Sequence, residues 1–232
     1  MSVTKKKLVV STGAGMSAES GISTFRDAGG LWEKYPVMEV ASAEGFARNP
    51  ELIHRFYNER RKQLVDAEPN AGHRGLVEFE RDYDVRVITQ NVDNLHERAG
   101  QSHVLHLHGE LMKVRAMDDE SLIWELDRDH LETSPRTLIE GHHVRPHIVF
   151  FQEAVPNIEP AIELVEEADV FVVIGTSLNV YPAAGLLHYV KPSTPVYYID
   201  PRPAAVPGGV HVIKATASQG VAELARLLNL HL

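Results

Sequence analysis

The chain has 232 residues, 44% of them hydrophobic and 24% charged, and a formal net charge of −9 at pH 7. This length supports one large domain that carries a smaller one, and the acidic balance argues against nucleic acid or an anionic membrane as partner. The chain contains no cysteine, which excludes disulfides, thiolate zinc ligands and cysteine nucleophiles. It has no apolar run of the roughly 20 residues that a membrane helix needs and no secretory signal pattern, so we expect a cytoplasmic protein.

Short apolar, β-branched runs recur along the chain between Gly, Asp or Pro residues. Such runs are typical of strands buried on both faces of a parallel sheet. Helical patterns occupy residues 158–167 and 218–228. The predicted strands are residues 7–12, 85–89, 147–151, 170–174 and 196–199, with shorter ones at 104–107 and 210–214. The alternation predicts a doubly wound, Rossmann-like α/β fold with a mostly parallel sheet.

Two stretches depart from this alternation. Residues 32–80 have a helical pattern with mixed charge, and residues 116–144 are polar and acidic. We expect these two insertions to form a smaller helical domain. Residues 1–31, 81–115 and 145–232 would then form the Rossmann-like domain.

The first predicted strand leads into a glycine-rich turn, Gly13-Ala14-Gly15-Met-Ser17. Glycines at this place permit a tight turn and a close approach of backbone N–H groups to a pyrophosphate. Ser17 can cap the next helix or bind a phosphate oxygen. A bare Gly-x-Gly also recurs by chance, so a turn without a ligand is an equal alternative for this motif alone.

Four blocks together resemble the sirtuin family, and they occur in the family's order. The blocks are the turn with Gly21-Ile-Ser-Thr-Phe25-Arg26-Asp27, then Thr89-Gln90-Asn91-Val-Asp93-Asn-Leu-His96, His106-Leu-His108-Gly109-Glu110 and Gly175-Thr176-Ser177-Leu-Asn-Val-Tyr-Pro182. The resemblance spans residues 8–220. It implies NAD as the cofactor and acyl-lysine peptides or proteins as partners.

The resemblance also implies which residues contact NAD. These are Gly13, Ala14, Gly15, Ser17, Phe25, Arg26, Gln90, Asn91, Asp93, Gly175, Thr176, Ser177, Asp200 and Ala217. Asp200 stands where the family usually has asparagine. Independently of the family, the loops that follow parallel strands converge on one crevice, and the amide and carboxylate groups at 90–93 suit a ribose and a carboxamide. Turn formation or helix capping is the alternative role for Asn91 and Asp93.

The reaction implied by the resemblance begins with attack of the acyl-lysine carbonyl oxygen on the nicotinamide ribose. Nicotinamide leaves, and the acyl group ends on ADP-ribose. A histidine suits the role of general base because its ordinary pKa lies near neutrality. His108 directly precedes Gly109, as the family's base does, so we assign it this role, with Asn91 and Asp93 as the other catalytic candidates.

Tyr57 and Arg60 lie three residues apart in a predicted helix and therefore share one face. A phenol beside a guanidinium can bind the distal carboxylate of a succinyl or malonyl group, and sirtuins that remove acidic acyl groups carry this pair. An exposed helix with a solvated arginine is the alternative. Residues 145–153 resemble the segment that pairs with substrate backbone, so Ile148, Val149 and Phe150 are substrate-binding candidates. Gln152 replaces a glycine of the family pattern.

Most sirtuins hold the segment after the catalytic histidine with four cysteines around zinc. Ala116 stands where the first cysteine is expected, and the spacing of His130, His142 and His143 matches no standard metal site. We therefore expect no zinc, and we expect residues 116–144 to fold by apolar packing of side chains such as Trp124 and Leu126.

Two other functions remain open on the sequence. The chain can be a mono-ADP-ribosyltransferase or NAD hydrolase, which would share the NAD contacts without needing Tyr57 or Arg60. It can also be a non-catalytic NAD sensor, although an intact His108 argues against that. The sequence does not determine the oligomeric state, for which we expect a monomer.

Overall fold

A computed structural model describes residues 4–22 and 35–230 of the chain. Its larger sheet is parallel and has six strands in the order β10-β9-β8-β1-β2-β3. The strands are β1 (Lys6–Thr12), β2 (Tyr83–Thr89), β3 (Val104–His106), β8 (Val170–Ile174), β9 (Val196–Ile199) and β10 (Val210–Ile213). The predicted doubly wound α/β fold is confirmed, because strands on both sides of β1 follow helical connections.

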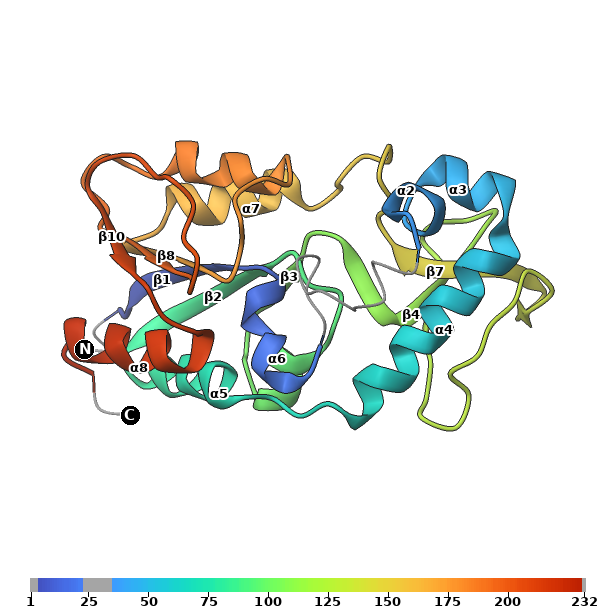
Figure 1. The fold of residues 1–232 in the computed structure, drawn as a ribbon, viewed down its shortest axis with the longest axis horizontal. Helices are drawn as coiled ribbons and strands as arrows, with labels where there is room; N and C mark the ends of the chain where they lie inside the picture. Colours follow the sequence, from blue (N-terminus) through green and yellow to red (C-terminus); the bar gives the residue numbers. More distant parts are fainter. Residues whose placement is uncertain (1–3, 23–34, 231–232) are drawn as a thin grey trace.

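Helices cover both faces of this sheet (Figure 1). On one face, Leu8 and Val10 of β1 pack against Leu76 and Leu224 of α5 (Ala71–Glu78) and α8 (Ala217–Leu227). On the other face, Val9 belongs to a core shared with α7 (Ile158–Glu166) and the 3-10 helix η4 (Ala183–Tyr189). Successive residues of one strand therefore enter two different cores, which explains why the strand is apolar throughout.

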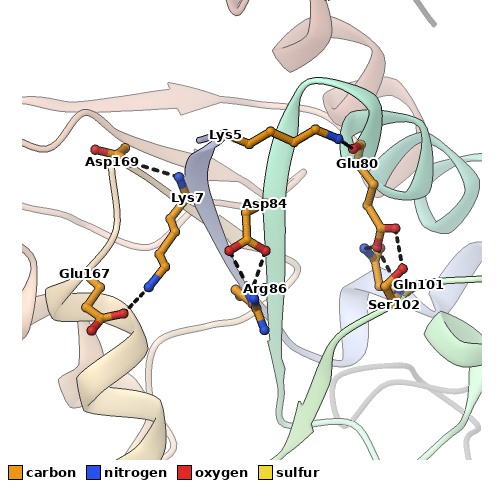
Figure 2. A network of polar contacts seen from close by, with 9 residues as sticks. All are labelled: Lys5, Lys7, Glu80, Asp84, Arg86, Gln101, Ser102, Glu167 and Asp169. Carbon is orange, nitrogen blue, oxygen red and sulfur yellow. Dashed lines mark hydrogen bonds and ion pairs between the residues drawn. The ribbon is translucent and has the colours of Figure 1, made fainter. Parts of the chain in front are cut away.

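Charged groups hold the amino-terminal edge of the sheet, opposite the loops that follow the strands (Figure 2). The Lys7 backbone N–H donates to Asp169 over 2.8 Å, and the Lys7 ammonium pairs with Glu167. On β2, Arg86 donates to both carboxylate oxygens of Asp84 at 2.8 and 3.0 Å. The two Lys7 contacts join the start of β1 to the segment before β8, and the Arg86–Asp84 pair lies within β2, so this edge has a structural role.

A second, antiparallel sheet has the order β5-β4-β7-β6. Its strands are β4 (Gly109–Ala116), β5 (Ile123–Glu125), β6 (Leu138–Ile139) and β7 (His142–Ile148). The prediction that residues 147–151 form a strand of the parallel sheet is wrong, because β7 pairs with β4 and only Phe151 bridges Ser42 beyond it. An apolar run indicates burial, but it does not say against which layer.

The expected boundaries at 115/116 and 144/145 fall inside β4 and β7. The 32–80 stretch also divides, since α5 packs on the parallel sheet while the earlier helices cover the second one (Figure 1). Those helices are α2 (Val37–Val40), α3 (Ala43–Arg48) and α4 (Pro50–Asp66). The remaining elements are α6 (Leu95–Ala99) and the 3-10 turns η1 (Ala14–Met16), η2 (Ala18–Ser20) and η3 (Phe79–Arg81).

A fully buried arginine of α4 holds the loop that follows β5. The Arg61 guanidinium donates to the carbonyls of Leu111 and Leu131 at 2.8 and 3.2 Å and to Asn58 at 2.8 Å. Asn58 in turn donates to the Thr133 carbonyl over 2.9 Å. The oxygens that accept these hydrogen bonds are neutral, and burial lowers the pKa of Arg61 to about 10. Beyond this network, Val114, Leu126 and Val144 form a small core of their own, with Trp124 against it.

None of the helices within residues 4–22 and 35–230 combines the length and apolar character needed to cross a membrane.

Two buried histidines are expected to make the folded protein less stable at acid pH. His54 and His73 are 2% and 0% exposed, and burial lowers the pKa of each to about 4, with Arg61 adding to the effect at His54. The unfolded chain titrates these groups near 6.5 and so binds protons that the folded chain does not. We expect the free energy of unfolding to fall between pH 6.5 and 4, on the order of 3 kcal/mol for each histidine.

Urea denaturation at a series of pH values measures this loss. The exposed His188 supplies the control, since His188→Gln should leave the pH dependence as it is in the wild type. A free energy of unfolding that stays constant from pH 7 to pH 4.5 would contradict the assignment of neutral buried rings.

Candidate active site

One cavity of about 690 Å³ lies where the loops after β1, β2, β8 and β9 meet. Gly13, Gln90, Gly175 and Asp200, which follow these strands, all line it. The cavity extends to the end of β7, where Ile148 and the following Phe150 contribute to its wall. The residues predicted to be catalytic or to bind NAD or substrate that line it are Gly13, Ala14, Gly15, Ser17, Tyr57, Arg60, Gln90, Asn91, Asp93, His108, Ile148, Val149, Phe150, Gly175, Thr176, Ser177 and Asp200.

The glycine turn after β1 packs directly on the loop after β8. The Gly15 N–H donates to the Gly175 carbonyl over 2.8 Å. A Cβ on Gly15 would lie 2.6 Å from the Gly175 Cα, and Gly175 has a φ of +64°. Glycine is therefore required at both positions, because the two backbones touch. The cavity wall is made of backbone at this point, as the approach of a pyrophosphate requires.

Asn91 and Asp93 tie the loop after β2 to the same glycine turn. The Asn91 side-chain amide donates to the Gly13 carbonyl at 3.0 Å and to the Ser17 hydroxyl at 3.2 Å. The Ser17 hydroxyl donates to Asp93 over 2.9 Å, and Asp93 also accepts the Leu95 N–H at 3.2 Å. Burial raises the pKa of Asp93, although both hydrogen bonds oppose that change. Asp93 thus shapes the turn before α6 and also lines the cavity, while Asn91 lines the cavity and ties the loop to the glycine turn.

His108 points one ring nitrogen at the backbone and lines the cavity. Its Nδ1 lies 3.0 Å from the Gln90 carbonyl, which can only accept, so Nδ1 carries the proton and Nε2 is left unprotonated in the neutral ring. Burial lowers the pKa of His108 below its ordinary value, and the Gln90 hydrogen bond partly offsets this. A neutral imidazole with a bare nitrogen at a cavity wall is suited to take a proton.

The glycine after His108 has a physical reason. Gly109 has a φ of +81°, and a Cβ there would lie 2.1 Å from the His147 carbonyl oxygen. The Val149 N–H donates to the His108 carbonyl over 3.0 Å. Because β7 approaches so closely, the histidine is held by the strand that also forms the cavity wall.

Tyr57 and Arg60 of α4 reach the same cavity as His108. Tyr57 is 3% exposed, and burial raises its pKa to about 12. Burial lowers the pKa of Arg60, while Tyr57 and Asp93 act in the opposite direction. The Arg60 guanidinium lies 5.7 Å from the centre of the Phe56 ring. The exposed-helix alternative does not describe this pair, since Tyr57 is buried and Arg60 is only partly exposed.

An ion pair fixes the turn after β7. Arg145 donates to both carboxylate oxygens of Glu153, at 2.6 and 3.1 Å, and Glu153 accepts the Phe150 N–H at 2.8 Å. Gln152 lies within this turn with a φ of +77°, a conformation that glycine adopts without strain. Its side-chain oxygen accepts the Glu44 N–H over 3.2 Å, which ties the turn to the start of α3.

One predicted contact falls elsewhere. Ala217 is packed in the core beneath the sheet rather than in the cavity wall, where the preceding Thr216 lies instead. Phe25 and Arg26 lie outside the described residues. The cavity wall also contains Val92, Tyr181 and Arg202, which were not predicted from the sequence as binding residues. Thr216 precedes a helix as a cap residue does, which was the one available signal for it.

The second sheet offers no set of ligands for a four-thiolate zinc. The chain has no cysteine, and the described residues contain no group of three or more His, Asp or Glu side chains placed to hold a metal ion. His142 pairs with Asp118 and His130 with Asp127, at separate places. The residues present therefore do not fit the metal that most sirtuins carry.

An open parallel sheet whose loops enclose a glycine-walled cavity at the carboxyl ends of the strands is the architecture of nucleotide-binding α/β proteins. Comparison with known proteins identifies the family within this class. The model of the Sir2 family matches residues 13–182. An NAD-dependent protein deacylase of Bacteroides thetaiotaomicron is 58% identical over 229 residues, which cover 96% of this chain and 98% of the relative. One from Helicobacter pylori is 48% identical over 222 residues, 94% of this chain and 96% of the relative.

Solved structures agree. A Sir2 homolog–NAD complex superposes with a TM-score of 0.86 at 37% identity, over 97% of this chain and 90% of that chain. A Sir2 protein with a deacetylated p53 peptide and 3'-O-acetyl ADP-ribose gives 0.83 at 28% identity, over 98% and 95% of the two chains. The chain belongs to the Sir2 family, which confirms the resemblance to sirtuins.

The contact between the glycine turn and the β8 loop predicts an effect on stability. We expect Gly15→Ala to lower the free energy of unfolding by about 1–3 kcal/mol, because the new methyl group forces two backbones apart. Gly208→Ala is the control, since a Cβ there meets nothing within 4 Å. Chemical denaturation compares the two variants, and an unchanged midpoint for Gly15→Ala would refute the close packing.

The hydrogen bonds of Arg61 predict a metal-independent second sheet. We expect the thermal midpoint to be the same with and without a chelator. Arg61→Met should lower the free energy of unfolding by about 3 kcal/mol, because it leaves buried carbonyls unpaired. The neighbouring Lys62→Met removes only an exposed ion pair with Glu132 and should change it by less than about 1 kcal/mol. A midpoint that falls on chelation would contradict this account.

Proposed function

We propose that this chain removes acyl groups from lysine side chains in an NAD-dependent reaction and prefers acyl groups that end in a carboxylate. One observation carries the proposal: the glycine turn, His108 and the Tyr57/Arg60 pair line a single cavity. A nucleotide, a base and an acyl-binding pair that share one cavity can act on the same lysine.

NAD is the cofactor, in keeping with the relatives that are NAD-dependent deacylases at 58% and 48% identity. The cavity suits it: a volume of about 690 Å³ lies in the range of small-molecule and cofactor sites. Among the described residues, the buried Thr216 hydroxyl at its wall has no hydrogen-bond partner, so a polar ligand atom would satisfy it. When bound, NAD supplies a nicotinamide leaving group and a ribose that accepts the acyl group.

His108 is the general base of the proposal. Its low pKa keeps the ring neutral at pH 7, and the Gln90 carbonyl holds the proton on Nδ1. Nε2 is then free to take a proton from a ribose hydroxyl. The acid limb of the activity profile lies below pH 6.5, because the base acts only when it is unprotonated.

Asn91 and Asp93 keep the floor of the cavity in place. The side-chain N–H groups of Asn91 donate to Gly13 and Ser17, which leaves the side-chain carbonyl oxygen of Asn91 to accept from a ligand. The buried Asp93 carboxylate sets the direction of the Ser17 hydroxyl. Both residues therefore orient the nucleotide against the glycine turn.

Arg60 and Tyr57 supply the preference for an acidic acyl group. A desolvated guanidinium at a cavity wall attracts a carboxylate strongly, because few competing waters surround it. The Tyr57 hydroxyl stays protonated at neutral pH and can donate to the same carboxylate. Phe56 and Phe150 pack on Tyr57 with ring centres 5.2 and 5.9 Å away, which keeps its orientation.

The peptide backbone would pair along the turn after β7. Val149 lies at the cavity wall between the buried Ile148 and Phe150, and the exposed Gln152 lines the same wall. Main-chain pairing gives affinity with little side-chain selectivity. The proposal includes a cytoplasmic, monomeric enzyme. Among the residues of the site that the structure describes, no contact favours a transferase or sensor role over deacylation.

Mass spectrometry of matched acetyl-lysine and succinyl-lysine peptides, with and without NAD, tests the proposal. We expect NAD-dependent loss of both acyl groups, with a higher kcat/KM for succinyl. His108→Ala should abolish both reactions. Arg60→Met should lower kcat/KM for succinyl by roughly ten- to a hundredfold, as for a lost charge-assisted hydrogen bond, and spare acetyl.

Arg55→Met is the matched control, because Arg55 lies on the exposed side of the same helix. An Arg60→Met variant that keeps the succinyl preference would refute the acidic-acyl pocket alone. No NAD-dependent loss of any acyl group by the wild type would refute the deacylase itself.

A further inference from the structure

A second histidine, His106, lies behind the cavity and is not part of its wall. It ends β3 and is 8% exposed. Its Nδ1 lies 3.0 Å from the Asn91 carbonyl oxygen, and its Nε2 lies 2.7 Å from a carboxylate oxygen of Glu97 on α6. A carbonyl and a carboxylate only accept, so both contacts are hydrogen bonds only when both ring nitrogens carry protons. The geometry therefore requires a positively charged His106.

The two histidines of this strand end hold two successive carbonyls. His108 donates to the carbonyl of Gln90, and His106 donates to the carbonyl of Asn91. The N–H groups of the same two residues are also bound, to the Thr12 carbonyl at 2.9 Å and the Thr89 hydroxyl at 3.0 Å. Hydrogen bonds thus hold both the N–H groups and the carbonyls of the Gln90–Asn91 turn, and His106 is the donor to the backbone carbonyl of Asn91.

Charged groups around His106 favour its proton. Glu97 comes from α6 and Glu110 from β4, and both raise the pKa of His106 against the opposing effect of burial. Asp93 lies in the turn itself, while His96 on α6 adds a neutral neighbour whose own pKa is lowered by burial. Burial opposes ionisation of Glu97, but the His106 hydrogen bond and Lys113 lower its pKa.

We propose that His106 and Glu97 are a positioning pair that holds the Gln90–Asn91 turn, and thereby Asn91 and His108, in the geometry that deacylation needs. The inference rests on the proposed function. Neither residue contacts the reacting atoms, and neither lines the cavity. Their effect passes through the one carbonyl that His106 binds.

The pair makes deacylation fall at alkaline pH. When His106 loses a proton, the carboxylate of Glu97 retains the remaining one on Nε2, because a bare nitrogen would face an anion. The bond to Asn91 is then lost. The pKa of His106 is raised above its ordinary value of 6.5, so this bond is lost above pH 6.5. Activity therefore falls as the pH rises through the raised pKa of His106. Glu97→Gln removes the dependence, since its amide donates to Nε2 and the proton stays on Nδ1.

Two substitutions of His106 separate its two bonds. An asparagine amide nitrogen takes the place of Nδ1, and a glutamine amide nitrogen takes the place of Nε2. We expect His106→Asn to keep most of kcat and to lose the alkaline limb. His106→Gln keeps the Glu97 contact, loses Asn91, and should lower kcat at every pH by at least about tenfold. His103→Gln, an exposed position just before β3, should match the wild type.

The measurement is kcat and kcat/KM against pH from 6 to 9 for the wild type and these four variants. Equal losses in His106→Asn and His106→Gln would overturn the proposal, because a merely structural histidine gives that result. An alkaline limb that persists unchanged in Glu97→Gln would also overturn it.

Nitrogen NMR of the imidazoles in the unliganded protein tests the pair without turnover. We expect both nitrogens of His106 to be protonated at pH 7 in the wild type, and one in Glu97→Gln. A neutral His106 in an active wild type overturns the positioning pair. A doubly protonated His106 in a wild type that deacylates nothing supports the pair and overturns the proposed function instead.

Discussion

The contact between two glycine turns sets the form of the site. Gly15 donates to the Gly175 carbonyl, and the two backbones lie too close for a side chain on either. This contact joins the ends of β1 and β8, which are neighbours in the sheet. Asn91 and Asp93 then reach the same turn from β2 through Gly13 and Ser17. A wall made of backbone without side chains lets a ligand approach closely, as the phosphate sites of this fold require.

The second sheet reaches the same cavity through a different close contact. Gly109 lies against the His147 carbonyl, so β7 closes on the segment that carries His108. The Arg61 network and the small core around Val114 hold this sheet with hydrogen bonds and apolar packing. An arrangement without thiolate ligands thus still delivers α4, and with it Tyr57 and Arg60, to the cavity wall.

Much of the fold follows from sequence pattern, because strands buried on both faces are apolar throughout. β1, β2, β8 and β9 were predicted within one or two residues, and the family and the α/β class are confirmed. The strand at 147–151 was placed in the wrong sheet, since Ile148 and Phe150 are buried against α4 and not within the parallel sheet. The His106–Glu97 contact went unnoticed, because thirteen histidines give residue type little weight without a partner.

The sequence by itself determined the family, the glycine turn, the order of the four blocks and the candidate base, since these depend on local conformation and on residues close in the chain. Only the tertiary structure decided which groups share the cavity, that Thr216 rather than Ala217 lines it, and which protons the histidines carry. The physical reason is that burial and hydrogen-bond partners come from distant segments. Gln90 and His108 are eighteen residues apart, and the carbonyl of one fixes the tautomer of the other.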